Sequence, residues 1–367
     1  MQHDLKKIFA NFQAEGTYDS GNPYGSGHIN DTFLVITREK DAKDYIVQRI
    51  NHQVFKNVPN LQNNILRVTT HLRKKLEQIP DSNPDREILT LIPSVENKPY
   101  YKDSKGNFWR IYIFIDDNRS YDRVENPSQA FEGGKAFGRF QYLISDLKGE
   151  PLFETIPYFH NMEKRLNTFF NTVEKDTLNR VNPASQQIKF VEDRAIEMTK
   201  ILQLGNEGKI PERITHNDTK FNNVLLDQHD KGLCVIDLDT VMPGYIHYDF
   251  GDSIRTSTNT GNEDEKDLSK VEMDISLFEA YSKGFLGETK SFLTIDEINN
   301  LAFSGKMMTF IIGLRFITDY LDGDNYFKTK HEHHNLQRAK AQFKLVTSME
   351  RQFTEMLEIV DKIVKEG

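Results

Sequence analysis

The chain has 367 residues, of which 37% are hydrophobic and 28% are charged, a balance typical of a soluble globular protein. This length predicts two domains or lobes, each large enough for its own hydrophobic core. The formal net charge of −8 argues against nucleic acid as the main partner. It does not exclude nucleotide binding, because a divalent cation and a few local positive charges can offset a weakly acidic field.

Cysteine content and hydropathy indicate the cellular compartment in which the protein is expected. Cys234 is the single cysteine, so an internal disulfide and a cysteine-based zinc cluster are excluded, and its apolar neighbours predict a small buried thiol. Residues 1–7 lack a secretory hydrophobic region, and the most apolar stretch, 307–317, is too short to span a bilayer and contains Arg315. We therefore expect a cytoplasmic protein, monomeric or weakly dimeric, without membrane or nucleic-acid partners.

The first third of the chain predicts a β-rich lobe with one conspicuous helix. Leu5, Ile8, Phe9 and Phe12 have the spacing of a short amphipathic helix. Leucine, isoleucine and valine residues recur at helical spacing over 61–76 and predict the longer helix. Strands are expected on either side of a glycine-containing turn within 24–37, and at 45–50, 98–102 and 108–115.

Helical periodicity dominates the remainder, after a hinge expected near 115–119. The predicted helices cover 128–147, 162–173, 188–204, 297–320 and 335–364. A strand-rich segment at 214–240 interrupts them. The sequence therefore predicts an α+β protein with a small β-rich lobe, residues 1–116, and a larger mainly helical lobe, residues 117–367. Ligand is expected in the cleft between the two lobes.

The segment 215–239 carries the chemistry. It contains the pattern H-x-D-x-K-x-x-N on a loop, followed by two short apolar strands and a carboxylate. Phosphoryl transfer needs a base for a hydroxyl proton, oxygen ligands for Mg²⁺ and a cation near the moving phosphoryl group. Asp218 is the candidate base and Lys220 the candidate cation. Asn223 and Asp237 are the candidate Mg²⁺ ligands, since hard cations take oxygen ligands.

Each of these residues also has an interpretation without chemistry. Asp218 could accept backbone hydrogen bonds in a turn, Asn223 could close the loop, and Lys220 could be a surface lysine. Asp239 is either a second or indirect metal ligand or a solvated carboxylate. His216 is expected to organise the loop, tying the backbone and Asp237 together, rather than to react.

The segment resembles the catalytic block of the aminoglycoside phosphotransferase and choline kinase superfamily, protein-kinase-like enzymes that act on small molecules. Longer strings resemble one group within it, the N-acetylhexosamine 1-kinases. These strings are GHINDT at 27–32, QRINHQVFKN at 48–57, VIDLDTVMPG at 235–244, DFGDSIR at 249–255 and RFITDYL at 315–321. They are long and are distributed over most of the chain.

The resemblance implies a protein-kinase-like bilobal fold, with a nucleotide-binding small lobe and a catalytic, substrate-binding helical lobe. It also implies ATP- and Mg²⁺-dependent phosphorylation of the anomeric hydroxyl of GlcNAc or GalNAc, a step of carbohydrate metabolism. The residues expected to bind the sugar are His28, Asp31, Asn217, Arg315 and Tyr326.

The expected ATP contacts depart from a typical kinase small lobe. The strand at 45–50 has no lysine, so Gln48 or Arg49 must replace the residue that binds phosphates. Strand alternation places these two side chains on opposite faces, and we expect Arg49 because of its charge. The short turn expected to contact ATP consists of Gly25, Ser26 and Gly27.

A second motif matches the protein-kinase metal motif in its letters alone. Asp249-Phe250-Gly251 resembles that motif, but Asp237 already occupies the metal position at a strand end. We therefore expect Asp249, Asp252 and Arg255 to support the site as loop and helix-start scaffolding.

Two alternatives remain. Another kinase of the superfamily could act on choline, homoserine or methylthioribose, and a choline pocket should contain an aromatic cage. The other alternative is a nucleotide-binding pseudokinase. The missing small-lobe lysine keeps it open, whereas the complete set of candidate catalytic and metal-binding residues within 218–237 argues against it.

Overall fold

The computed structural model describes residues 3–25 and 29–366. The chain forms two compact units, of which unit 1 contains Met1–Arg119, Leu143–Pro157 and Leu225–Pro243. Unit 2 contains Ser120–Tyr142, Tyr158–Val224 and Gly244–Gly367. The division into lobes at residue 116 stays a prediction. Three residues with predicted roles, Ser26, Gly27 and His28, lie outside the described residues.

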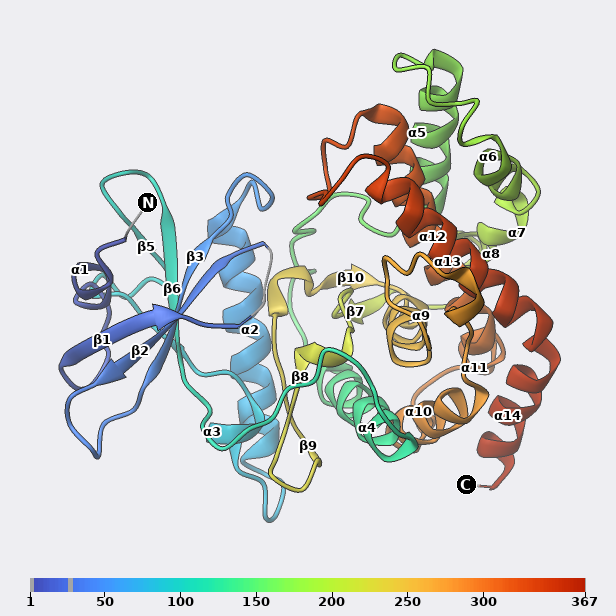
Figure 1. Ribbon diagram of the computed structural model, residues 1–367. Coiled ribbons are helices and arrows are strands. Elements are labelled where there is room, and N and C mark those ends of the chain that lie inside the picture. Colours follow the sequence, from blue (N-terminus) through green and yellow to red (C-terminus); the bar gives the residue numbers. More distant parts are fainter. Residues whose placement is uncertain (1–2, 26–28, 367) are drawn as a thin grey trace. The chain divides into compact units, whose positions relative to one another are not determined.

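Unit 1 is built on an antiparallel sheet (Figure 1). Its described part has six strands in the order β1-β2-β3-β6-β4, with β5 also paired to β6. The strands are β1 (Tyr18–Pro23), β2 (Asp31–Thr37), β3 (Tyr45–Ile50), β4 (Leu91–Ile92), β5 (Tyr101–Lys102) and β6 (Phe108–Ile113). Odd-numbered residues of β3, such as Tyr45 and Val47, form a core with α1 (Leu5–Phe9), so this helix covers one face of the sheet.

The first strand begins earlier than the sequence predicts. We expected it from Tyr24, but β1 ends at Pro23 and pairs with β2 from Tyr18↔Thr37 to Pro23↔Phe33. Its sequence YDSGNP lacks apolar alternation, and all six of its residues are half-buried or exposed. An edge strand tolerates proline and glycine because it pairs on one side alone, which explains why the pattern failed here.

Helix α2 (Val58–Leu76) ties distant segments into unit 1. It starts three residues before the predicted helix, because Asn57 caps its first turn by accepting from Asn60 N. The buried Asn64 donates to the carbonyls of Phe153 (2.7 Å) and Val241 (3.1 Å) and accepts from Phe153 N (3.0 Å). These bonds explain why residues 143–157 and 225–243 belong to this unit.

The remaining elements of unit 1 are short. Strands β8 and β9 pair with each other, and β8 also forms a two-way backbone bridge between Leu226 and Arg119. The elements are α3 (Pro84–Glu87), most of β8 (Val224–Leu226), β9 (Gly232–Val235), η2 (Leu238–Thr240) and most of β10 (Met242–Gly244). Cys234 on β9 is buried, as predicted.

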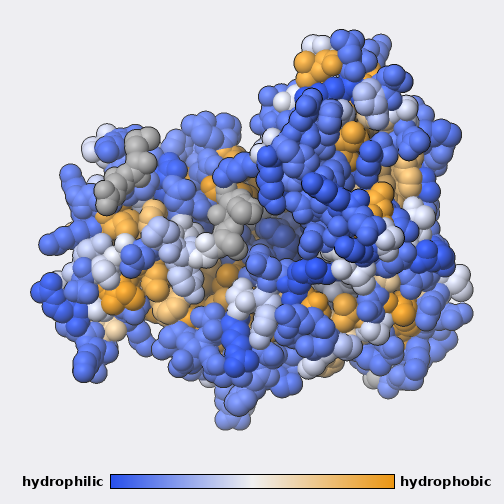
Figure 2. All heavy atoms as spheres, viewed as in Figure 1, coloured by the Kyte–Doolittle hydropathy of each residue, from blue (hydrophilic) through white to orange (hydrophobic). Residues whose placement is uncertain are grey.

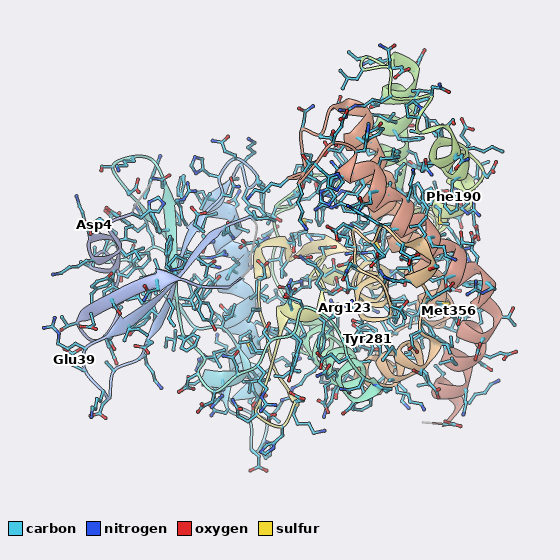
Figure 3. All side chains as sticks on the ribbon, viewed as in Figure 1. Asp4, Glu39, Arg123, Phe190, Tyr281 and Met356 are labelled. Atoms are coloured by element: carbon cyan, nitrogen blue, oxygen red, sulfur yellow. The ribbon has the colours of Figure 1, made fainter. Side chains whose placement is uncertain are left out.

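Unit 2 is mainly helical. Its elements are most of α4 (Pro127–Ile144), then α5 (Met162–Lys175), α6 (Ser185–Glu192), α7 (Ala195–Met198), α8 (Lys200–Asn206), β7 (Arg213–Thr215), η1 (Phe221–Asn223), α9 (Ile246–Ser257), η3 (Leu268–Lys270), α10 (Ile275–Thr289), α11 (Ile295–Asn299), α12 (Leu301–Asp322), α13 (His334–Arg351) and α14 (Phe353–Glu366). One of its hydrophobic cores contains Phe343, and the half-buried Phe190 packs on it. Another core contains Tyr281 and Met356 (Figure 3).

Helix α12 is the central helix of unit 2 and packs against α5, α9 and α13 (Figure 1). It is longer than the apolar stretch noted in the sequence, and by length and composition it could cross a membrane. In the structure 89% of its most apolar window is buried inside the protein, as in a core helix. On the face shown in Figure 2, most residues are hydrophilic and hydrophobic ones show in small patches.

Three predicted helices are interrupted. The segment 188–204 forms α6, α7 and α8, 297–320 contains a break at Asn300 between α11 and α12, and 335–364 breaks at Gln352. Hydrophobic periodicity continues across these breaks, so it does not reveal them. Helix α10 was not predicted, and for α9 the sequence predicted a helix start but not the extent of the helix.

Candidate active site

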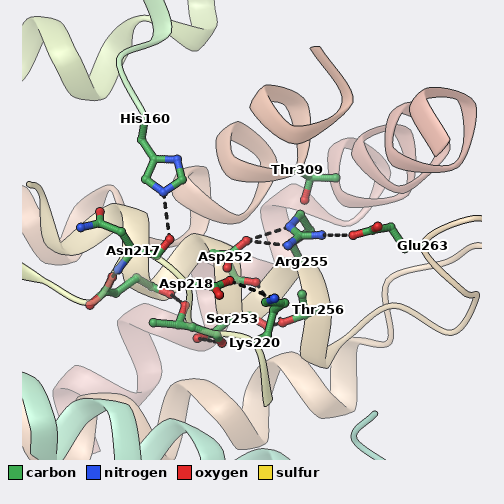
Figure 4. Close-up of polar contacts among 12 residues, drawn as sticks. His160, Asn217, Asp218, Lys220, Asp252, Ser253, Arg255, Thr256, Glu263 and Thr309 are labelled. Atoms are coloured by element: carbon green, nitrogen blue, oxygen red, sulfur yellow. Dashed lines mark hydrogen bonds and ion pairs between the residues drawn. The ribbon is translucent and has the colours of Figure 1, made fainter. Parts of the chain in front are cut away.

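The candidate catalytic loop lies in unit 2 between β7 and η1, and its predicted residues lie close together (Figure 4). Lys220 Nζ is 3.3 Å from Asp218 Oδ1. Asn223 Nδ2 donates to the Asp218 carbonyl (2.8 Å) and to Oδ2 (3.3 Å). Because these two bonds of Asn223 use Nδ2, its Oδ1 can serve as a cation ligand. Mg²⁺ keeps several waters and binds nucleotide phosphates, so it needs few protein ligands.

Helix α9 holds the loop backbone through a buried carboxylate. Asp249 accepts from His216 N (2.8 Å) and Asn217 N (2.7 Å), and Gln141 Nε2 donates to it (2.6 Å). Burial raises the pKa of Asp249, while His216 and these hydrogen bonds oppose that shift. The prediction that Asp249 supports the site is confirmed, although it lies within α9 rather than on a loop.

His216 supports the loop from inside. It is fully buried, and the edges of Phe137 and Phe140 pack against it at 5.6 and 5.8 Å between ring centroids. Its Nδ1 accepts from Asp218 N at 3.3 Å. The expected contact of His216 with the loop backbone is confirmed, and its expected tie to Asp237 stays a prediction.

A buried ion pair on α9 lies beside this loop (Figure 4). Arg255 Nη2 is 2.7 Å from Asp252 Oδ1, and Glu263 approaches the same guanidinium at 3.4 Å. Burial alone would raise the pKa of Asp252, but the charge and hydrogen bond of Arg255 outweigh it, with Lys220 also lowering it. Asp252 therefore stays ionised and contributes negative charge near Lys220.

The predicted sugar residues Arg315 and Tyr326 lie together in unit 2. Arg315 Nη2 is 3.3 Å from the Tyr326 hydroxyl, and the guanidinium lies over the rings of Phe159, Tyr326 and Phe327 at 5.0 to 5.5 Å from their centroids. Both residues line a pocket with a volume of about 400 Å³. Arg165, which sequence reasoning missed, lines it as well.

His160 connects this pocket to the catalytic loop. Its Nε2 is 3.1 Å from the Asn217 carbonyl, and its ring lies 4.3 Å from that of Phe159. Burial and the charge of Arg315 lower its pKa to about 3, so the imidazole is neutral at pH 7 and donates from Nε2. The Asn217 side chain bonds to Thr215 within the loop, and its predicted sugar contact stays a prediction.

In unit 1 the carboxylates after β9 differ from each other. Asp237 has a left-handed backbone, φ 61°, and directly precedes η2. Asp239 is 3% exposed, forms a bidentate ion pair with Arg110 and accepts from Asn30 Nδ2 (2.6 Å). The interpretation of Asp239 as a solvated carboxylate is therefore wrong. The predicted Mg²⁺ contact of Asp237 stays a prediction.

The two cationic strand residues lie on opposite faces of the sheet. Arg49 pairs with Asp31 at 2.5 Å, on the face that α1 covers. Arg110 pairs in register with Gln48, donates to its Oε1 (2.8 Å) and lies on the other face. The nucleotide contact of Arg49 and the sugar contact of Asp31 stay predictions. The signal for Arg110 in the sequence was an arginine within the apolar strand FWRIYI.

Gly25 has a left-handed backbone, with φ 75°, in the turn after β1, which suits glycine. Its predicted contact with ATP stays a prediction. Among the described residues, no group of three or more histidine, cysteine, aspartate or glutamate side chains converges as a metal site.

The fold and the loop define the chain as a kinase-like phosphotransferase. Residues 20–274 match the family described as "APH: Phosphotransferase enzyme family", so the chain belongs to this family. The predicted α+β, protein-kinase-like fold is confirmed.

Solved structures share this fold along almost the whole chain. An aminoglycoside phosphotransferase from Alicyclobacillus acidocaldarius is 11% identical, covers 100% of this chain and 98% of its own, and gives a TM-score of 0.61. A choline kinase from Cryptosporidium parvum is 14% identical with 96% of both chains covered and a TM-score of 0.61. The amicoumacin kinase hAmiN, in complex with AMP-PNP, Ca²⁺ and amicoumacin, is 13% identical, with 95% and 92% covered and a TM-score of 0.59. Identities this low show a shared fold alone.

Proposed function

We propose that this phosphotransferase uses ATP to phosphorylate the anomeric hydroxyl of N-acetylhexosamines. The observation that carries the phosphoryl-transfer chemistry is the loop in which Asp218, Lys220 and Asn223 lie within hydrogen-bond or ion-pair distance. The sugar rests on the resemblance of the strings along the chain to N-acetylhexosamine 1-kinases.

In this proposal Asp218 orients the anomeric hydroxyl and accepts its proton as the sugar oxygen attacks the γ-phosphorus. A bond forms between that oxygen and phosphorus, and the bond from phosphorus to the β–γ bridging oxygen breaks. The products are hexosamine 1-phosphate and ADP, and Asp218 later releases the proton to water. Lys220 offsets negative charge on the phosphoryl group in flight.

Asn223 and Asp237 are the proposed ligands of Mg²⁺, which would neutralise charge on the phosphate oxygens. Gly25, Ser26, Gly27 and Arg49 are the proposed ATP contacts, within a nucleotide-binding lobe of residues 1–116. The kinase hAmiN, with AMP-PNP and Ca²⁺ in its complex, supports a nucleotide and a divalent cation as a pair in this fold.

His28, Asp31, Asn217, Arg315 and Tyr326 are the proposed sugar contacts. Arg315 with Tyr326 supports this role, since a guanidinium and a phenol provide several donors and an aromatic surface for a sugar. We also propose a cytoplasmic location and a catalytic lobe of residues 117–367.

A choline-type acceptor is less compatible with the described part of the pocket. The aromatic rings that could enclose a quaternary ammonium group already surround the Arg315 guanidinium. A cationic acceptor at this position would be repelled by Arg315 and by Arg165.

The test is a panel of acceptors with ADP release as the readout: GlcNAc, GalNAc, glucosamine, galactosamine, choline and homoserine. We expect turnover with the two N-acetylated sugars and at least tenfold lower kcat/KM with the others. Equal activity on all sugars, or a preference for an amino alcohol, would refute the sugar assignment. Activity on none of them, with intact nucleotide binding, would indicate a different acceptor or a pseudokinase.

A further inference from the structure

The pocket beside α5 and α12 contains an excess of positive charge. Its lining includes the cationic residues Arg165, Lys175 and Arg315 and the acidic residues Asp319 and Asp322. One of the acidic residues is already used by the fold, because Asp319 accepts from Tyr326 N (2.8 Å), Phe327 N (3.0 Å) and the Asn335 side chain (2.9 Å).

The two guanidiniums of the pocket lack ionic partners among the described residues. Arg165 donates through Nε and Nη2 to one carbonyl, that of Phe159, at 3.2 and 2.9 Å. Arg315 makes its hydrogen bond to a neutral hydroxyl. No carboxylate of residues 3–25 or 29–366 lies within 4.0 Å of either guanidinium.

These charges act on each other. Burial, followed by the charge of Arg315, lowers the pKa of Arg165 to about 10, so it remains protonated at pH 7. Two protonated guanidiniums in one partly buried pocket repel each other, and an anion between them would remove that repulsion. Neutral hydroxyl groups would compensate the charge less well.

The pocket is close to the candidate base along a chain of contacts within unit 2. The Arg315 guanidinium lies 5.0 Å from the centre of the Phe159 ring, and this ring lies 4.3 Å from that of His160. His160 in turn bonds to the Asn217 carbonyl, the residue before Asp218. A substrate whose hydroxyl reaches Asp218 is therefore near this pocket.

We propose that this pocket is an anion subsite, in which Arg165 and Arg315 bind a sulfate, phosphate or carboxylate group. The group comes from an anionic substituent of the acceptor or from a free anion. The subsite rests on the proposed function in one respect alone, the identity of the sugar that carries the substituent.

A measurement of anion binding tests the subsite without relying on enzymatic activity. Inorganic phosphate and sulfate are titrated into the full chain and into Arg165→Gln, with heat of binding as the readout. We expect binding to the wild-type chain and at least tenfold weaker binding to Arg165→Gln. Arg165→Lys, which keeps the charge, should recover part of the affinity. The control is Arg38→Gln, because Arg38 is 69% exposed in unit 1 and its loss leaves the pocket unchanged.

Thermal unfolding of each variant shows that it is folded before it is compared. Equal affinity for phosphate in wild type and folded Arg165→Gln would overturn the subsite. If Arg165→Gln does not fold, Arg165→Lys and Arg315→Gln take its place, and unchanged affinity in both has the same meaning.

Kinetics then separate the two sources of the anion. If the anion belongs to the acceptor, N-acetylglucosamine 6-sulfate or 6-phosphate gives a higher kcat/KM than N-acetylglucosamine. In Arg165→Gln the ratio of these two kcat/KM values then falls at least tenfold. If it is a free anion, sulfate binds and the charged sugars gain nothing. Inactivity on every sugar, with phosphate binding that depends on Arg165, would refute the sugar assignment and leave the subsite intact.

Discussion

Arg110 and Asp239 form the most deeply buried ion pair described in unit 1, with side chains 1% and 4% exposed. Burial alone would lower the pKa of Arg110, but Asp239 and its other neighbours raise it, so the guanidinium stays charged. Removing one member of such a pair leaves the other as an unpaired buried charge. That loss costs far more than the pair itself contributes.

We predict that Arg110→Met lowers the free energy of unfolding by about 3–5 kcal/mol. Arg49→Met is the matched control on the neighbouring strand, because Arg49 and Asp31 are 32% and 45% exposed. It should cost less than about 1 kcal/mol, since water screens a pair of this kind. Urea denaturation of both variants measures the difference, and equal losses would contradict the distinction between the two faces of the sheet.

The candidate catalytic residues could be predicted from sequence because they lie within six positions on one loop, so a local pattern contains them. Asp249 was predicted to support the site, but the particular contacts that hold the loop could not be predicted. Asp249 binds loop residues that are 32 and 33 positions away in the sequence, and Asp239 pairs with Arg110 over a separation of 129 positions. Contacts over such separations depend on the tertiary fold, which composition and spacing do not determine.

Helices α4 and α10 approach each other through glycines. A Cβ at Gly284 would lie 2.1 Å from the Phe131 carbonyl oxygen, and one at Gly134 would lie 2.2 Å from the Tyr281 carbonyl oxygen. Both obstacles are backbone atoms, so a side chain at either position must push the helices apart.

We predict that Gly284→Ala destabilises the chain by about 1–3 kcal/mol, the usual cost of overpacking. Gly287→Ala on the same helix is the control, since a Cβ there meets nothing within 4 Å. It should raise stability by about 0.5–1 kcal/mol, because alanine favours a helix more than glycine does. Thermal and urea unfolding test both, and a stabilised Gly284→Ala would show that the helices do not meet this closely.

Glu272 joins the segment before α10 to α13 and gives an acid-dependent contribution to stability. A hydrogen bond from Ser348, aided by Arg351 and Lys344, lowers its pKa from 4.5 to about 2. Because the folded pKa is depressed, this contribution is present above about pH 4.5 and is lost as the pH falls towards 2. In Glu272→Gln we expect a flatter decline of unfolding free energy between about pH 4.5 and 2. The same slope as in the wild-type chain would argue against this assignment.

The helix at 61–76 was easier to predict from sequence than α9. The helix at 61–76 was found because its apolar residues alternate with exposed polar ones. In α9 eleven of the twelve residues are buried and several are polar, so the pattern IHYDFGDSIRTS has no apolar stripe. A capping box between Thr294 and Glu297 begins α11 at Ile295, a local signal that hydrophobic periodicity ignores.

At the scale of the molecule, the order of elements was sufficient to predict the α+β fold. A β-rich first third followed by helices is preserved in the structure, and the family match covers residues 20–274. The boundaries of the units could not be predicted from the sequence. Residues 143–157 and 225–243 belong to unit 1 because of long-range contacts such as those of Asn64.

Nucleotide binding should stabilise the whole chain. At a MgATP concentration of about 100 times Kd, the free energy of unfolding should rise by about 2.7 kcal/mol, because the ligand binds the folded state alone. Chelation of Mg²⁺ should remove most of this gain. In Asp237→Asn the difference between ATP with and without Mg²⁺ should become small, whereas an unchanged difference would remove Asp237 from the metal site.

Turnover of Asp218→Asn tests the central claim most directly. The variant keeps the size of the side chain but lacks the carboxylate that accepts the proton. With GlcNAc and ATP, we predict that kcat falls by about 10² to 10⁴, while thermal unfolding and MgATP affinity stay as in the wild type. Asp193→Asn, on the surface beside Lys189, serves as the control and should keep full turnover. Wild-type turnover in folded Asp218→Asn would contradict the assignment of Asp218 as the base.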